Sequence, residues 1–294
     1  MPEWQGKSQS SKLGYQIFIH VSKAFGLTPA YMLLRFVALY YFLFSRQSSK
    51  YIYQYFRRQH NYGKLKASKS LYMNYYRFGQ TLLDRIVLTS GMFNKFTCHF
   101  DGEENLLDIV KQGKGGIFLS AHVGNWEAAG FFLQRLNAPV HVVMYDGEHQ
   151  QIKDYLRQVT GERKFNVIVI SDDLSHVYAI GEALQKNELV CLHADRFIDQ
   201  SKTNRCRFMN GEALFPTGPF ALAAGFDVPV SLVYGFKESN THYHFFGSAG
   251  IGRLQGEGKR DFSKRLQDIF VRDLETKVKM YPEQWFNYYK FWLS

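Results

Sequence analysis

The chain has 294 residues, 46% apolar and 21% charged, which is enough to build a hydrophobic core in one large or two small domains. Its formal charge of +10 suggests a polyanionic partner, either nucleic acid, an anionic membrane surface or an acidic protein. Its three cysteines, Cys98, Cys191 and Cys206, form no CxxC pair and therefore argue against a disulfide framework or a zinc site. No secretory signal peptide is recognisable, and a reducing, cytoplasmic setting is expected.

The N-terminal segment is rich in aromatic residues. Residues 31–45 read YMLLRFVALYYFLFS, interrupted only by Arg35, and are fewer than the roughly 20 residues that span a bilayer. Lysines and arginines follow closely, and tyrosine-rich helices with such flanks suit the headgroup region of a membrane. We expect a membrane-associated helical segment over residues 1–60, which either spans the bilayer or lies in its plane. The alternative is a helix buried in the protein core.

From about residue 100, short apolar runs alternate with amphipathic stretches. Strands are expected at 115–122, 140–145, 165–170, 188–195, 228–236 and 242–247. Helices are expected at 126–136, 151–159, 174–186, 219–225 and about 261–280. Alternation at this spacing predicts an α/β fold, with a mostly parallel central sheet flanked by helices, in one domain over residues 61–294.

The stretch LSAHVGNWEAAG, residues 119–130, places His122 five residues before Glu127. On a continuous helix these side chains would be about 140° apart, and in a strand they would lie on opposite faces. They meet only if the chain turns between them, and Gly124 followed by Asn125 supplies a permissive residue and a good helix N-cap. We therefore expect His122 at the carboxyl end of a strand and Glu127 in the next helix, at the edge where α/β sheets bind ligands.

A histidine held by a carboxylate suits general-base catalysis, because the carboxylate fixes the tautomer and stabilises the imidazolium that forms. The chain has no GxSxG elbow, and its motif offers no serine or cysteine as an obvious nucleophile, so a substrate hydroxyl is the expected proton source. The alternative to catalysis is that His122 is a structural histidine and that Glu127 only places a negative charge at a helix N-terminus.

Two later stretches carry further signals. LVCLHADR ends a predicted strand with Asp195 and Arg196, on the same sheet edge as His122 if the strands are parallel, and arginine suits recognition of phosphate or carboxylate. GEALFPTGPFALA, residues 211–223, has a turn before a helix whose exposed amides would favour an anion. Taken separately, each is equally compatible with an ordinary surface ion pair or a plain turn.

Together with an apolar Val-Pro strand, these stretches resemble the four sequence blocks of the lysophospholipid acyltransferase superfamily. In chain order the blocks are AHVGNWE, CLHADR, LFPTG and VPVSLVY. The form His-x-Gly-Asn-Trp-Glu is similar to that of the lipid A late acyltransferases, the lauroyl/myristoyl transferase group, and so is the tail YPEQWFNYYKFW, residues 281–292. The resemblance covers roughly residues 100–292 and implies a membrane-associated O-acyltransferase.

The resemblance implies a role for each matched residue. His122 would be the general base and Glu127 its orienting partner. Arg196 would bind an anionic group of the acceptor or donor, with Asp195 supporting it. The other matched residues would position loops or shape the turn beside that group: Asn125, Trp126, Pro216, Thr217 and Gly218.

No metal or organic cofactor is implied. His193, His242 and His244 are expected to be structural, because an HYH strand offers two ligands and no third. Thr217 stands where the FPEG block of glycerolipid enzymes carries glutamate, whereas the CLHADR block is closer to those enzymes than to lipid A enzymes. The acceptor is therefore open between a hydroxyacyl chain of a lipid A precursor and another amphipathic lipid or polyene alcohol.

The implied partners are an acyl thioester of acyl carrier protein or coenzyme A, a lipid acceptor, and the anionic cytoplasmic face of the bacterial inner membrane. A charge of +10 suits both an acidic carrier protein and anionic lipid. No nucleic acid is expected, because the basic residues form no known nucleic-acid motif. Two other functions stay open: a thioesterase or lipid hydrolase that uses the same His–Glu pair on water, and a non-catalytic lipid- or nucleic-acid-binding protein.

Overall fold

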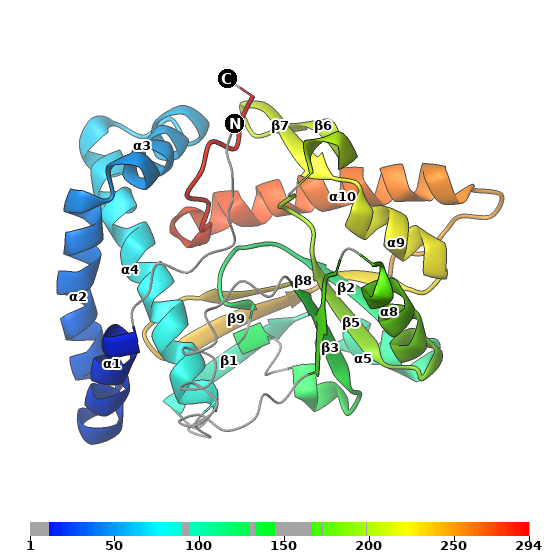
Figure 1. Ribbon diagram of the computed structural model, residues 1–294, viewed down its shortest axis with the longest axis horizontal. Coiled ribbons are helices and arrows are strands. Elements are labelled where there is room, and N and C mark those ends of the chain that lie inside the picture. The colour runs from blue at the N-terminus through cyan, green and yellow to red at the C-terminus, as the bar shows by residue number, and fades with distance from the viewer. Residues whose placement is uncertain are drawn as a thin grey trace. The chain divides into compact units, whose positions relative to one another are not determined.

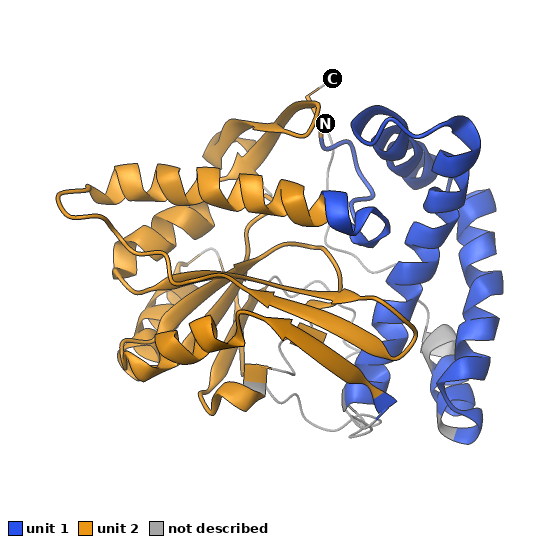
Figure 2. Ribbon diagram, turned by 180° about the vertical axis from the view of Figure 1, so that it is seen from behind, with its two compact units in different colours: residues 1–95, 147–163, 279–291 blue, residues 96–146, 164–278, 292–294 orange. Residues whose placement is uncertain are grey.

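The computed structural model describes residues 12–89, 95–126, 128–129, 133–144, 166–171, 173–197 and 199–293. The described residues fall into two compact units, which Figure 2 shows in blue and orange. The first unit contains the described residues up to Lys95 and the segment 279–291. The second contains the described residues from Phe96 to 278, together with Trp292 and Leu293. The helix predicted at 151–159 lies outside the described residues.

The first unit is built from helices. They are α1 (Lys12–Phe25), α2 (Leu27–Phe44), α3 (Arg46–Gln54), the π-helical turn η1 (Tyr55–Gln59) and α4 (Lys64–Thr89). Helices α2 and α4 pack closely, since a Cβ added to Gly79 would lie 2.4 Å from Leu34 Cδ1. The buried Tyr31 hydroxyl donates a hydrogen bond to the buried Asp84 carboxylate. The unit therefore extends past the boundary expected at residue 60, because α4 belongs with α2.

The tail motif packs in the same unit. Its short 3-10 turn η5 (Pro282–Gln284) follows the last helix of the chain. The fully buried Asn74 side chain of α4 donates hydrogen bonds to the carbonyl oxygens of Glu283, at 3.1 Å, and Trp285, at 2.9 Å. These bonds hold the PEQW stretch against α4, a placement that spacing in the sequence does not reveal.

Helix α2 has a buried face and an apolar exposed face. Over its 18 residues the mean hydropathy is 1.5 and only 22% of the residues are buried, so by length and composition it could cross a membrane. Among the described residues it is the one helix that meets this test. Its exposed large apolar side chains are Met32, Phe36, Leu39, Tyr40, Leu43 and Phe44. Exposure of such a patch is typical of a surface that contacts a membrane or another apolar partner.

The second unit contains a seven-stranded sheet in the order β1-β9-β8-β2-β5-β3-β4 (Figure 1). The strands are β1 (Thr97–Asp101), β2 (Gly116–Ser120), β3 (Val140–Met144), β4 (Asn166–Val169), β5 (Leu189–His193), β8 (Val230–Lys237) and β9 (His242–Gly247). The helices are α5 (Glu103–Lys111), α8 (Ser175–Gln185), α9 (Gly218–Phe226) and α10 (Lys259–Met280).

Five of the strands run in one direction. Each pairing among β8, β2, β5, β3 and β4 is parallel, whereas β9 runs antiparallel to β8 and carries β1 parallel to itself. The prediction of an α/β fold with a mostly parallel sheet flanked by helices is confirmed. The carboxyl ends of β2, β5 and β8 consequently meet at one edge.

Helices cover both faces of this sheet. Leu106 and Ile109 of α5 join a buried cluster with Phe118 of β2 and Val233 of β8. On the opposite face, α10 brings the Lys277 ammonium 3.5 Å from the centre of the Phe246 ring of β9. Alternate strand residues point to opposite faces, so β8, in which every residue is buried, is covered on both sides, whereas β9 is buried on one face and partly exposed on the other.

A separate hairpin precedes α9. Strands β6 (Thr203–Phe208) and β7 (Gly211–Pro216) pair antiparallel as a two-stranded sheet, and the turn between them begins at Met209 with φ of 54°. The indole Nε1 of Trp292 donates a hydrogen bond of 3.0 Å to the Phe208 carbonyl. The β7 strand thus ends at Pro216, directly before the turn that opens α9.

Candidate active site

His122 lies two residues beyond the end of β2, and Asp195 lies two residues beyond the end of β5. The parallel register pairs Ser120 with His193, and the Ala194 N–H donates to the Ser120 carbonyl at 2.9 Å. The residues that follow the two strands, His122 after β2 and Asp195 after β5, therefore lie side by side at the same edge of the sheet. The Asp195 carboxylate accepts two hydrogen bonds from His122, one from the backbone N–H at 3.0 Å and one at ring Nδ1 at 2.8 Å.

The chain turns directly after His122, as the sequence predicts. Gly124 has φ of +58°, and a Cβ on it would lie 2.0 Å from the Gly235 carbonyl oxygen of β8. Both the backbone conformation and the close approach require glycine. At this turn the chain ends its course along β2 and lies against Gly235 of β8.

Asn125 is almost fully buried, at 3% exposure, and its backbone N–H and both polar atoms of its side chain make hydrogen bonds. Its backbone N–H donates to Gly235 at 2.7 Å, and its side-chain oxygen accepts from the Ala128 N–H at 3.0 Å. Its amide nitrogen donates to the Tyr243 hydroxyl at 2.9 Å. Capping of the helical residues that follow is the expected use of asparagine at this position.

The structure places the carboxylate of Asp195 against His122, and the predicted orienting role of Glu127 stays a prediction. Glu127 lies outside the described residues. Within the described part of the chain, Asp195, which was expected to support Arg196, holds both the backbone and the ring of His122. A sequence signal for this pairing existed, since both residues were placed at the same sheet edge, but the contact depends on the register of β2 against β5.

The electrostatics of the pair favour a neutral imidazole beside an ionised carboxylate. Burial lowers the pKa of His122, and the Arg196 guanidinium lowers it further, although Asp195 opposes both. Burial raises the pKa of Asp195, but His122, Arg196 and His193 together hold it well below its ordinary value. The side chain of Asp195 is 2% exposed and that of His122 is 27% exposed, so the base can reach solvent or substrate while its partner cannot.

His193, which is expected from the sequence to be structural, is a neighbour of His122. The two rings are tilted by 36° with centroids 4.4 Å apart, and the Trp126 indole meets the His193 ring edge-on at 5.4 Å. Burial lowers the pKa of His193 to about 3, and His122 and Arg196 lower it in the same direction. His193 is therefore neutral and forms one wall beside the base. No signal in the sequence shows that its ring turns toward His122.

The Phe-Pro-Thr-Gly turn leads from β7 into α9. Thr217 makes two hydrogen bonds to the Lys202 carbonyl, from its backbone N–H at 3.0 Å and its hydroxyl at 3.1 Å. The Gln267 amide of α10 donates to the Pro216 carbonyl at 3.0 Å, and a Cβ on Gly218 would meet open space. In the described part of the chain these hydrogen bonds join the turn to Lys202, before the hairpin, and to α10, and none of them is made with His122.

Two groups of the described residues have the composition of a metal site. One combines His122, His193 and Asp195, and the other lies on β1 and β9. In the first group both Asp195 oxygens already accept hydrogen bonds from His122, and the Arg196 cation lowers the pKa of both histidines. These contacts suit proton transfer at His122 better than binding of a dication.

Comparison with known proteins identifies the family of the chain. The chain matches the family described as bacterial lipid A biosynthesis acyltransferase over residues 81–294. Among solved structures it is similar to the crystal structure of the 1-acyl-sn-glycerophosphate (LPA) acyltransferase PlsC from Thermotoga maritima, with a TM-score of 0.40 and 11% identity, covering 83% of this chain and 97% of that one. A comparison with curated protein sequences gives no match. Because the family match includes the whole His122–Asp195 region and most of the chain, the protein belongs to the bacterial lipid A biosynthesis acyltransferase family and is a lipid acyltransferase.

Proposed function

We propose that the protein transfers a fatty acyl group from an acyl thioester to a hydroxyl of a lipid A precursor, with His122 as the general base. The observation that carries this proposal is the hydrogen bond between His122 Nδ1 and the buried Asp195 carboxylate. It fixes the ring so that Nε2 is the nitrogen that meets the acceptor hydroxyl.

The reaction needs no covalent enzyme intermediate. The acceptor oxygen attacks the thioester carbonyl carbon, a C–O bond forms, and the hydroxyl proton passes to His122 Nε2. The C–S bond then breaks, and the imidazolium returns the proton to the departing thiolate. The depressed pKa of His122 keeps the ring neutral at pH 7, which is the state that accepts a proton.

Asp195 and Glu127 are the two carboxylates proposed to serve this base. Asp195 stabilises the imidazolium that forms during attack, since its own depressed pKa keeps it ionised. Glu127 occupies the position that the family motif gives to the orienting acid. We propose that it assists His122 from the same motif, whereas Asp195 follows β5. Arg196 is proposed to bind an anionic group of donor or acceptor, because its charge already reaches both His122 and Asp195.

The remaining matched residues are proposed to shape the site. Asn125 holds the turn through its bonds to Gly235, Ala128 and Tyr243, and Trp126 packs against His193. The turn formed by residues 216–218 is proposed to face the anionic group of a substrate, with Thr217 in place of an acidic side chain.

The first unit is proposed to associate with the cytoplasmic face of the bacterial inner membrane. The exposed apolar side chains of α2 supply buried area in the lipid, and the net charge of +10 attracts anionic headgroups. The same charge favours the acidic acyl carrier protein as the donor over coenzyme A.

Product analysis tests transfer against hydrolysis. Purified protein in detergent is incubated with an acyl carrier protein or coenzyme A thioester, with and without a hydroxyacylated lipid A precursor, and the products are separated by mass spectrometry. Acyl transfer predicts an acylated lipid that appears only with the acceptor, at a higher rate from the carrier protein thioester. Release of free fatty acid as the main product, with or without acceptor, would establish a thioesterase instead.

A further inference from the structure

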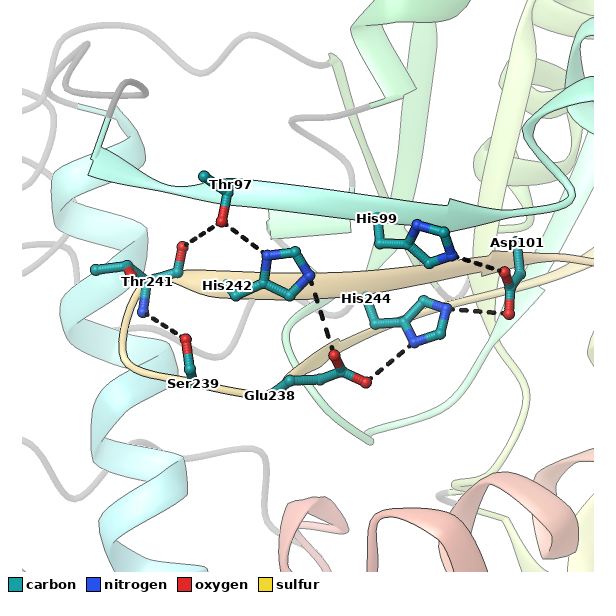
Figure 3. Close-up of polar contacts among 8 residues, drawn as sticks. All are labelled: Thr97, His99, Asp101, Glu238, Ser239, Thr241, His242 and His244. Carbon is teal, nitrogen blue, oxygen red and sulfur yellow. Dashed lines mark hydrogen bonds and ion pairs between the residues drawn. The ribbon is translucent and has the colours of Figure 1, made fainter.

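A second group of histidines and carboxylates lies on the exposed face of β1 and β9, remote in the sheet order from β5 (Figure 3). His99 Nε2 lies 3.1 Å from Asp101 Oδ1, and His244 Nε2 lies 3.0 Å from Asp101 Oδ2. The two imidazole rings have centroids 4.9 Å apart. The Asp101 carboxylate therefore sits between two imidazole Nε2 atoms that come from neighbouring strands.

The backbone explains why these side chains meet. Alternate residues of β1 are exposed, so His99 and Asp101 share one face, and the parallel register pairs His99 directly with His244. Considered alone, strand β9 gives only the two histidines of its HYH stretch. The further ligands come from β1, whose alternately exposed residues form no apolar run that would predict a strand.

The spacing of the three groups fits a small divalent ion. Their nearest ligand atoms all lie within 4.8 Å of one another. Nitrogen and oxygen ligands around a tetrahedral zinc ion, with bonds of about 2.1 Å, lie about 3.4 Å apart. The observed nitrogen–oxygen separations are 3.1 Å from His99 to Asp101 Oδ1 and 3.0 Å from His244 to Asp101 Oδ2. Binding of one ion therefore requires side-chain rotation that brings the two rings to a shared position, and the side chains of His99 and Asp101, which are 62% and 54% exposed, have room for it.

Glu238 completes a second layer around His244. Its Oε1 lies 3.1 Å from His244 Nδ1, and its Oε2 lies 4.0 Å from His242 Nε2. Metal-binding histidines commonly donate the other ring N–H to a carboxylate, which fixes the tautomer and directs the remaining nitrogen at the ion. Glu238 is in the position to do this for His244, with Nε2 directed at Asp101.

The local charge also favours a cation. Asp101 and Glu238 supply two carboxylates, and the cation on the packed helix is Lys277 of α10. Lys277 lies over the Phe246 ring, and burial lowers its pKa. Among these described groups, the two carboxylates outnumber the one ammonium group.

We propose that His99, His244 and Asp101 bind one Zn²⁺ ion, with Glu238 orienting His244 and water in the fourth position. Such an ion would tie β1, the edge strand of the sheet, to β9 through side chains in addition to the backbone ladder. The proposal is independent of the acyl-transfer chemistry at His122.

Zinc binding is measured on tag-free, full-length protein that has been stripped with a chelator and exchanged into zinc-free buffer. Zinc sulfate alone is added, unbound metal is removed, and the bound metal is counted by mass spectrometry. We expect one zinc per chain in the wild type and less than a tenth in a His99→Ala/His244→Ala double variant. Zinc at 100 times its dissociation constant should raise the wild-type Tm by about 5 °C and leave that of the double variant unchanged.

Two controls and a second test variant separate this site from other zinc ligands. His20→Ala removes an exposed histidine of α1 and should keep the full stoichiometry. His122→Ala breaks the other histidine–carboxylate group and should also keep one zinc. Asp101→Asn, for use if the double variant does not fold, should lose the zinc. Absence of zinc in the wild type, or loss of zinc in His122→Ala with retention in Asp101→Asn, would overturn the proposal.

Discussion

The sheet carries two groups of histidines and carboxylates, and their surroundings give them different chemistry. At the edge formed by β2 and β5, the side chains of His122 and Asp195 are 27% and 2% exposed, and Arg196 lies close enough to lower the pKa of both. On β1 and β9, the side chains of His99 and Asp101 are 62% and 54% exposed, and Glu238 adds a second carboxylate. Burial beside a cation favours a neutral base, whereas exposure beside carboxylates favours a bound cation.

Neutralising the buried carboxylate of Asp195 should have the largest effect on the difference between the two groups. Asp195→Asn removes the charge that stabilises the imidazolium at His122, and we expect kcat/KM for acyl transfer to fall about 10²- to 10⁴-fold with the fold retained. Steady-state kinetics with a circular dichroism check of folding measure this. Asp108→Asn, on the exposed surface of α5, is the control and should stay within about twofold of the wild type.

Glu127→Gln, measured alongside, distinguishes the two carboxylates. The hydrogen bonds to His122 predict that Asp195→Asn causes the larger loss. A severe loss in Glu127→Gln with nearly full activity in Asp195→Asn would assign the orienting role to Glu127 alone and contradict the role of Asp195.

The turn that separates His122 from the following helix should be the most sensitive backbone position of the site. Gly124→Ala places a Cβ against the Gly235 carbonyl at positive φ, and we expect a destabilisation of about 3 kcal/mol and a Tm at least about 6 °C lower. Thermal unfolding measures the change. Gly252→Ala, where a Cβ would meet open space, is the matched control, and equal Tm values for the two variants would refute the steric argument.

Acid stability reports the burial of the histidine beside the base. The pKa of His193 is lowered to about 3 in the folded protein, so below its ordinary value near 6.5 the unfolded chain takes up a proton that the folded protein does not. Stability is therefore lost as pH falls from about 6.5 toward 3, by about 1.4 kcal/mol per pH unit for this group.

His193→Asn should reduce this loss. Between pH 7 and pH 5 the free energy of unfolding of the wild type should fall by about 2 kcal/mol more than that of the variant. Urea titrations at the two pH values measure the difference, with His20→Asn as the control for loss of an exposed histidine. Parallel pH dependence in wild type and His193→Asn would show that His193 is not held neutral.

The smallest expected effect concerns the cation of the buried group. Because Arg196 lowers the pKa of His122, Arg196→Gln should move the acid limb of the kcat/KM profile to higher pH. The free-enzyme profile between pH 5 and 8 measures this shift. Arg205→Gln, which removes a surface arginine of β6, should leave the limb in place. A shift to lower pH in Arg196→Gln would contradict the electrostatic account.

The parallel core of the fold is predictable from sequence because buried strands appear as apolar runs. Strands predicted at 115–122 and 188–195 contain β2 and β5, and the strand predicted at 228–236 includes all of β8 except Lys237. In contrast, β1 has alternately exposed residues in the stretch TCHFD and gives no apolar run, so it escapes notice. The hairpin of β6 and β7 is missed for the same reason, since TNRCRF is polar and largely exposed.

The sequence predicts which edge of the sheet carries the site, but not which side chains contact one another there. The sequence places His122 and Asp195 at the ends of two strands, and Gly124 with Asn125 predicts the turn. Strand register and side-chain direction decide which carboxylate contacts His122 and place the His193 ring beside it. The same limit hid the group on β1 and β9, because the pairing of His99 with His244 joins residues far apart in the chain.

The most direct test of the account is a single-turnover transfer assay with His122→Ala. Acyl carrier protein thioester and a hydroxyacylated lipid A precursor are mixed with excess enzyme, and the acylated product is followed over time. We expect the rate to fall at least about 10²-fold relative to the wild type, because the base that accepts the hydroxyl proton is gone. The His20→Ala control should transfer at the wild-type rate. A folded His122→Ala variant that transfers within about tenfold of the wild-type rate would contradict general-base catalysis by His122.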